Sequence, residues 1–144
     1  MSESTAKPPD PSQLSLQRRY APNSICFGCG PANPRGLQLQ SFVQGDAVIA
    51  TFQPEEYQQA FPGVLNGGII GALLDCHSNW TAAHALMQAR GLSAPPCTVT
   101  ADFHVKLRAP TALSGVLTVR AWPVQIDGAP SAGAASAGTE PAGT

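Results

Sequence analysis

An acidic side chain stands in the middle of an otherwise apolar stretch, LNGGIIGALLDCHSNW, at residues 65–80. An ionised carboxylate is seldom buried without a partner, so Asp75 must either pair with donors or do chemistry. The stretch opens on Asn66, Gly67 and Gly68, and a helix that starts there points unpaired N–H groups and the positive end of its dipole outwards. Such amides, together with the Asn66 side chain, can hold a carbonyl oxygen or an oxyanion. With Asp75 nearby as general base or nucleophile, they predict an acyl-transfer site.

A purely structural role for Asp75 is the alternative. On a helical wheel at about 100° per residue, Asp75 falls on a stripe of small and polar residues that includes Gly71 and Asn79. In this interpretation another stretch of backbone packs against the stripe, and the carboxylate bonds to it. Asp75 does not lie among large aliphatic residues, because the larger side chains fall on the neighbouring stripe: Ile70, Leu73, Leu74, His77, Trp80 and Thr81.

The elements that must position these residues follow from the hydrophobic pattern. Residues 67–90 are rich in helix formers and contain no proline, and Gly91 would end the helix. Alternating apolar residues predict four strands, at residues 36–40, 46–52, 98–108 and 113–126. The order of elements predicts an α+β fold in which an antiparallel sheet packs against one long helix.

Composition divides the chain into three parts. Residues 1–20 are polar and rich in proline, which predicts a flexible N-terminal arm. Residues 128–144 contain no large apolar side chain, which predicts a disordered tail after a domain at residues 21–127. Asp127-Gly128 is a hairpin signal with no returning strand directly behind it. Either this dipeptide lies in a surface loop, or the sheet lacks its last strand or strands.

Charge, hydropathy and cysteine usage exclude several classes of function. The chain has eight Lys and Arg, which are scattered, and a net charge of −1, so we expect no nucleic-acid partner. No apolar run approaches the roughly 18 residues of a membrane helix, and no secretory signal is visible. Four cysteines are too few for a disulfide framework, which favours the cytoplasm.

Two motifs resemble those of a known family. FPGVLNGGIIGALLD, at residues 61–75, is similar to the helix-start motif of hotdog-fold acyl-CoA thioesterases of the phenylacetate-pathway type, in which HGG is followed by an Asp. CFGCGPANPRGLQLQ, at residues 26–40, resembles the segment that opens the first strand in one branch of these enzymes. The resemblance covers about residues 24–127. It implies a hotdog fold, in which an antiparallel sheet wraps around a long central helix.

The resemblance also implies roles for individual residues. It assigns to the Gly67 amide the polarisation of a thioester carbonyl, and to Asp75 the activation of water or direct attack. Asn66 stands where the motif has His, so it can donate a hydrogen bond but cannot take a proton. The acid usually works on substrate bound mainly by the other subunit, which implies a homodimer or a tetramer. The substrate-binding residues would be Gly68, Gln59, Phe61, Lys106 and Arg108, the two cations near the phosphates of coenzyme A.

The remaining features leave alternatives open. Cys26 and Cys29 form a CxxC, half of a zinc site, but Cys76 and Cys97 stand alone in the sequence. We therefore expect no metal and no cofactor. Besides an acyl-CoA thioesterase, the sequence allows a non-catalytic or truncated hotdog protein that at most binds acyl-CoA. A hotdog hydratase would need a paired Asp and His, which the sequence does not offer.

Overall fold

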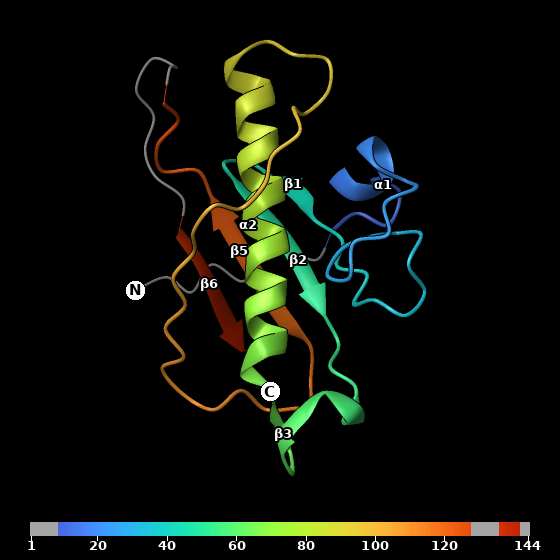
Figure 1. The fold of residues 1–144 in the computed structure, drawn as a ribbon, viewed down its shortest axis with the longest axis vertical. Coiled ribbons are helices and arrows are strands. Elements are labelled where there is room, and N and C mark those ends of the chain that lie inside the picture. The colour runs from blue at the N-terminus through green and yellow to red at the C-terminus, as the bar shows by residue number, and fades with distance from the viewer. Residues whose placement is uncertain (1–8, 128–135, 142–144) are drawn as a thin grey trace.

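The computed structural model describes residues 9–127 and 136–141 of the 144-residue chain. One long helix, α2 (Gly67–Ala89), lies across one face of an antiparallel sheet (Figure 1). The strands of this sheet are ordered β1-β2-β5-β6. They are β1 (Phe42–Gln44), β2 (Ala47–Phe52), β5 (Leu117–Trp122) and β6 (Ser136–Pro141). The predicted α+β fold is confirmed.

Helix α2 begins and ends where its sequence predicts. Asn66 is its N-cap, and the Asn66 side chain accepts hydrogen bonds from the first turn. At the other end Gly91 adopts a φ of 61°, a left-handed conformation that glycine takes without strain. The predicted bounds of 67–90 therefore agree with the observed helix to within one residue.

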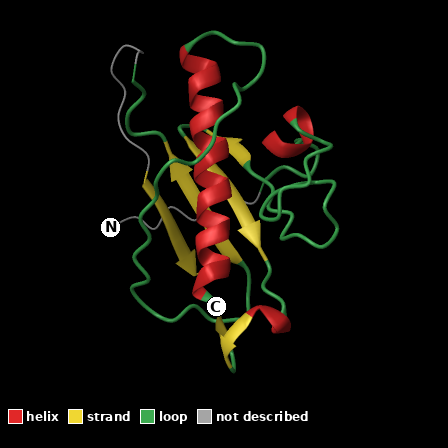
Figure 2. Cartoon of the chain, in the orientation of Figure 1, coloured by secondary structure: helices red, strands yellow, loops and turns green. Residues whose placement is uncertain are grey.

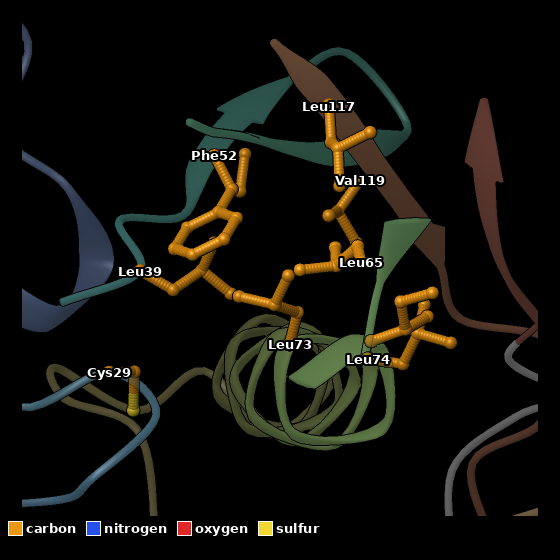
Figure 3. Close-up of a cluster of buried hydrophobic side chains, with 10 residues drawn as sticks. Cys29, Leu39, Phe52, Leu65, Leu73, Leu74, Leu117 and Val119 are labelled. Carbon is orange, nitrogen blue, oxygen red and sulfur yellow. The ribbon is translucent and has the colours of Figure 1, made fainter. Parts of the chain in front are cut away.

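The face of α2 that carries large apolar residues packs on the sheet. Figure 3 shows Leu73 and Leu74 directed at Phe52 and Val119 of the two central strands. Leu73 and Val119 are fully buried. Burying a side chain of this size stabilises a fold by about 1.5–3 kcal/mol, so these contacts fix the helix on the sheet.

His77 is the polar exception on this buried face. Its ring bonds to the Val48 carbonyl and to the Ser41 hydroxyl, each at 2.8 Å. A carbonyl can only accept, so Nε2 donates to Val48 and Nδ1 accepts from Ser41. Burial lowers the pKa of His77 to about 4, which keeps the ring neutral. His77 is thus a satisfied core residue.

The first two strands are joined by a tight turn at Gly45-Asp46, where Gly45 has a φ of 59°. The strand predicted at residues 36–40 is wrong, because the first strand begins only at Phe42. The backbone of this stretch bonds to a preceding loop and not to a strand. The apolar alternation of residues 36–40 arises because Leu37 and Leu39 both pack towards the core, although their backbone is irregular.

The strand predicted at residues 98–108 is also wrong. None of these residues, all of which the structure describes, belongs to a strand. Residues 98–108 run along α2 and pass over its start (Figure 1), and we call them the crossing segment. Its apolar side chains are largely exposed, with Val99 at 85% and Phe103 at 55%. A strand needs a neighbour to pair with, and within one chain this segment lies on a helix.

The chain ends also differ from their predictions. Residues Leu16–Tyr20, assigned above to the flexible arm, form the short helix α1. Its Gln17 is fully buried and bonds to Ser41 through both ends of its side-chain amide. Within the predicted tail, β6 pairs antiparallel with β5, so a strand does return to this edge; the rest of the tail lies outside the described residues. The strand predicted at residues 113–126 is shorter than expected and ends before Pro123.

Three small elements lead into α2. A 3-10 helix (Glu56–Gln58) is followed by the antiparallel pair β3 (Gln59–Phe61) and β4 (Val64–Leu65), which form a separate two-stranded sheet. Figure 2 shows this hairpin projecting beyond the helix start. Among the described residues, no helix combines the length and apolar character that crossing a membrane requires.

Candidate active site

The start of helix α2 offers one free amide. The Asn66 side-chain oxygen accepts from the N–H groups of Gly68 and Ile69, at 2.8 and 3.3 Å. The expectation that the Gly68 amide is also available is therefore wrong, since the cap occupies it. The Gly67 N–H has no acceptor within residues 9–127 and 136–141. This amide is the group at the helix start that can receive a carbonyl oxygen.

The Leu107 side chain approaches position 67 closely. A Cβ added to Gly67 would lie 2.8 Å from the Leu107 side chain of the crossing segment. Leu107 itself is 57% exposed. The crossing segment therefore passes over the helix start, where it leaves the glycine backbone within reach of a ligand.

Asp75 lies half-buried in the middle of α2, with its carboxylate facing the crossing segment. The Thr100 hydroxyl donates to one carboxylate oxygen at 2.5 Å. One turn further along, the Asn79 amide donates to the Thr98 carbonyl at 3.4 Å. A groove of about 630 Å³ between the helix and the crossing segment is lined by Asp75 and Asn79. The carboxylate is thus oriented by a hydroxyl and faces a groove that substrate can enter.

Thr100 is a site residue that the sequence does not predict. The only available signal was its place on the polar face of the alternating stretch, which many solvent-facing threonines share. Its bond to Asp75 spans 25 positions of sequence and depends on how the crossing segment returns along the helix. A single sequence does not specify that return.

Gly67 and Asp75 of one chain are too far apart to act on one thioester. Eight residues separate them, and a helix rises 1.5 Å per residue, so they lie about 12 Å apart along the axis. A reacting carbonyl must lie about 3 Å from both its donor and its base or nucleophile. The expectation that an atom held at the Gly67 amide lies near Asp75 therefore fails within one chain.

Two predicted substrate-binding residues lie in the hairpin before the helix. Gln59 is half-buried, and its side-chain oxygen accepts from the Gly63 N–H at 3.1 Å. This bond closes the turn between β3 and β4. Phe61 is 72% exposed, so it is a surface side chain that no part of the described core covers.

The two predicted cations lie on the crossing segment. Lys106 and Arg108 are both exposed and flank Leu107, the residue that passes over Gly67. The structure thus brings them to the helix start, although they follow Gly67 by about 40 positions. Exposed cations at this place can meet the phosphates of a ligand whose acyl end reaches the Gly67 amide.

Three thiols meet beside Asp75. Cys26, Cys29 and Cys76 have sulfur atoms within 4.8 Å of one another, and Cys76 directly follows Asp75 on the helix. A hydrogen bond from Cys76 lowers the pKa of Cys29 to about 6, while the same bond and burial raise the pKa of Cys76. Cys76 stands alone in the sequence, because fifty positions separate it from Cys26.

A larger hollow, of about 1020 Å³, lies at the far end of α2 beside the β1–β2 turn. None of the predicted site residues lines it; its polar lining comes from Asp46, Thr81, His84, Gln88 and Arg120. This hollow lies at the C-terminal end of α2, away from the amides of the helix start, and the carboxylate in its lining belongs to Asp46, an exposed residue of the β1–β2 turn. The groove at Asp75 is therefore the stronger candidate for chemistry.

Comparisons with known proteins agree with the fold. No family model matches the chain, and no curated protein does. Among solved structures, the chain is similar to a thioesterase superfamily protein from Shewanella loihica PV-4. The two are 30% identical in sequence, with a TM-score of 0.54, and the match covers 67% of this chain and 77% of that one.

Proposed function

The chain belongs to the thioesterase superfamily, and on that premise we propose that it is an acyl-CoA thioesterase. Its antiparallel sheet and long helix make a hotdog fold. The observation that carries the proposal is the start of α2, where the Gly67 N–H finds no acceptor in the described part of the chain. A thioester carbonyl is the kind of group that such an amide polarises.

In the proposed reaction, the Gly67 N–H donates to the carbonyl oxygen and stabilises the negative charge that develops there. Asp75 takes a proton from a water molecule as the water oxygen bonds to the carbonyl carbon. The C–S bond then breaks, and the coenzyme A sulfur leaves with the proton. Alternatively, the carboxylate attacks the carbon itself, the C–S bond breaks as coenzyme A leaves as its thiolate, and water hydrolyses the resulting anhydride. Thr100 orients the carboxylate in either case.

Two copies of the chain must meet for this reaction. Because Gly67 and Asp75 of one chain are about 12 Å apart, we infer that the amide of one copy works with the carboxylate of the other. The crossing segment supports this assembly, since its exposed Val99, Phe103 and Leu107 form an unpaired apolar edge next to the groove. A homodimer, alone or within a tetramer, is the proposed active form.

The substrate contacts are proposed from the same arrangement. Lys106 and Arg108 would meet the phosphates of coenzyme A, and Gly68, Gln59 and Phe61 would border the entrance. Kinship with the phenylacetate-pathway type and a cytoplasmic location are further parts of the proposal. The first rests on the two sequence motifs, and the second on the small number of cysteines.

One observation favours a second function. Asn66 caps the helix with its side-chain oxygen, so the residue that replaces the motif's His supplies no base. The second candidate function is therefore binding of acyl-CoA without hydrolysis.

A thioesterase assay separates the two functions. The full-length protein is incubated with a panel of short, long and aromatic acyl-CoAs, and release of the free coenzyme A thiol is followed. Binding is measured in parallel by calorimetry on the same panel. Turnover of at least one member supports the thioesterase, whereas binding without turnover across the panel contradicts it.

A further inference from the structure

A turn of the chain and the middle of α2 together present three sulfur atoms. Cys26 and Cys29 come from the CxxC turn at residues 26–29, and Cys76 comes from the helix. The sulfur of Cys26 lies 3.7 Å from that of Cys76, and all three lie within 4.8 Å of one another. Cys97, the fourth cysteine, is exposed and lies outside this group.

These distances fit a shared metal ion. Zinc binds thiolate at about 2.3 Å in tetrahedral geometry, so two sulfur ligands of one ion lie about 3.8 Å apart. A disulfide would need the two sulfur atoms at about 2.0 Å, and it would leave the third thiol without a partner. The three sulfur atoms lie close together, but no two of them are near enough to form a disulfide. This arrangement is that of the ligands of a shared metal ion.

The turn that carries two of the thiols is shaped to bring them to the helix. A Cβ at Gly28 would collide with the Cys76 sulfur, and a Cβ at Gly30 would collide with the backbone of Cys26. The Gly30 N–H donates to the Cys26 carbonyl at 2.8 Å, which closes the turn on itself. Both glycines are thus needed for the close approach of the three sulfur atoms.

The rest of the loop holds this turn in place. The carbonyl groups of Phe27 and Gly28, the two residues between the cysteines, accept from the N–H groups of Leu37 and Leu39 at 2.7 and 3.0 Å. These two bonds fix the turn within the loop, and its cysteine side chains lie against the helix. Figure 3 shows Cys29 beside α2, apart from the aliphatic part of the core.

We propose that Cys26, Cys29 and Cys76 bind one Zn²⁺ ion as three thiolates. The ion ties the loop before β1, which has no helix or strand between residues 21 and 41, to the middle of α2. A stretch of this length without a helix or strand is uncommon inside a compact domain, and a bound metal would fix its position. Among the described residues no fourth Cys, His, Asp or Glu joins the cluster, so water completes the tetrahedron.

The test measures metal binding directly and does not depend on the proposed activity. The full-length protein is purified under reducing conditions, stripped with a chelator and titrated with Zn²⁺ against a competing chelator. Co²⁺ serves as a second probe, because thiolate-to-cobalt charge transfer absorbs in the near ultraviolet. We expect one ion per chain and a charge-transfer band.

Cysteine variants show whether these sulfur atoms are the ligands. Cys26→Ser changes an exposed residue, so its fold should survive, and circular dichroism checks this. We expect it to weaken Zn²⁺ binding by more than the roughly 100-fold that loss of a mere supporting partner can cost. Cys76→Ser should do the same, whereas Cys97→Ser is the matched control and should bind like the unmodified chain.

Three results would overturn the proposal. One is a reduced, folded protein that binds neither Zn²⁺ nor Co²⁺. Another is a folded Cys26→Ser variant with unchanged affinity. The third is a Cys26–Cys76 disulfide, found by thiol counting, in protein purified without reductant but with Zn²⁺ present throughout.

Discussion

Thr100 donates a hydrogen bond to Asp75 at 2.5 Å, and this bond joins the crossing segment to the middle of helix α2. It gives the carboxylate a fixed orientation at the edge of a groove. A hydroxyl that holds one carboxylate oxygen leaves the other to accept a proton from water or to attack. The geometry therefore assigns Thr100 a positioning role towards Asp75.

Replacing this hydroxyl should lower turnover without unfolding the protein. Thr100→Val keeps the shape of an exposed side chain and removes the donor. A hydrogen bond to a charged group contributes about 1.5–3 kcal/mol, so we expect kcat to fall by about 10-fold or more, with KM little changed. Thr100→Ser, which keeps the hydroxyl, should restore the rate. Steady-state kinetics decide, and equal kcat for the two variants would contradict the role.

Asp75→Asn tests the carboxylate itself. The amide keeps the size of the side chain and can still accept from Thr100, but it cannot take a proton or attack. Losing a general base typically lowers the rate by about 10²–10⁴-fold. Asp46→Asn, in the β1–β2 turn, is the matched control and should leave the rate unchanged. Coenzyme A release and the thermal midpoint are measured for both.

A structural role for Asp75 predicts the opposite pattern. The variant would lose about 1–3 kcal/mol of stability if a donor were left unmatched, while activity per folded molecule stayed the same. A lower thermal midpoint with unchanged turnover would therefore show that Asp75 has a structural role and no catalytic one.

Local sequence predicted the helix well, because its signals are local. Asn66 caps α2, Gly91 ends it, and the residues between them follow one period. The stripe of larger side chains could be located from the same period, and the structure buries most of it: Ile70, Leu73, Leu74, His77 and Thr81. The helix start could be located from sequence for the same reason, although the capping bond that occupies the Gly68 amide could not.

Contacts between distant parts of the chain could not be predicted. The crossing segment has the alternation of a strand, but alternation does not say which neighbour pairs with it. Leu37 and Leu39 alternate too, yet they lie in a loop, and their N–H groups donate to the CxxC turn. Cys76 joins that turn across fifty positions, which spacing rules for metal sites do not cover.

The Gly67 amide can be removed with little disturbance to the helix. Proline is favoured at the first helical position and has no N–H, and Asn66 already has the extended conformation that precedes proline. Gly67→Pro should therefore lower kcat by about 10²–10³-fold, the usual cost of losing one oxyanion donor.

Gly67→Ala is the control for this variant, because it adds a Cβ against the end of the Leu107 side chain but keeps the N–H. We expect it to retain most of the activity. If alanine and proline lower kcat equally, the crowding of Leu107 explains the loss, and the amide has no catalytic role.

Mixed dimers test whether two copies share one site. Copies with Asp75→Asn keep the Gly67 amide, and copies with Gly67→Pro keep the carboxylate. In a dimer of one of each, one site would have both groups intact and the other site neither. Random mixing makes half of the dimers mixed, so the activity should recover to about a quarter of that of the unmodified protein.

The mixture is made by unfolding and refolding the two variants together, and each variant refolded alone is the control. Light scattering at micromolar concentration checks that the protein assembles at all. Recovery well above the sum of the controls would show that Gly67 of one copy and Asp75 of the other serve one thioester. A mixture no more active than its controls, or a monomeric mass in light scattering, would rule out the shared site, because the 12 Å rise between the two residues then has no second copy to bridge it.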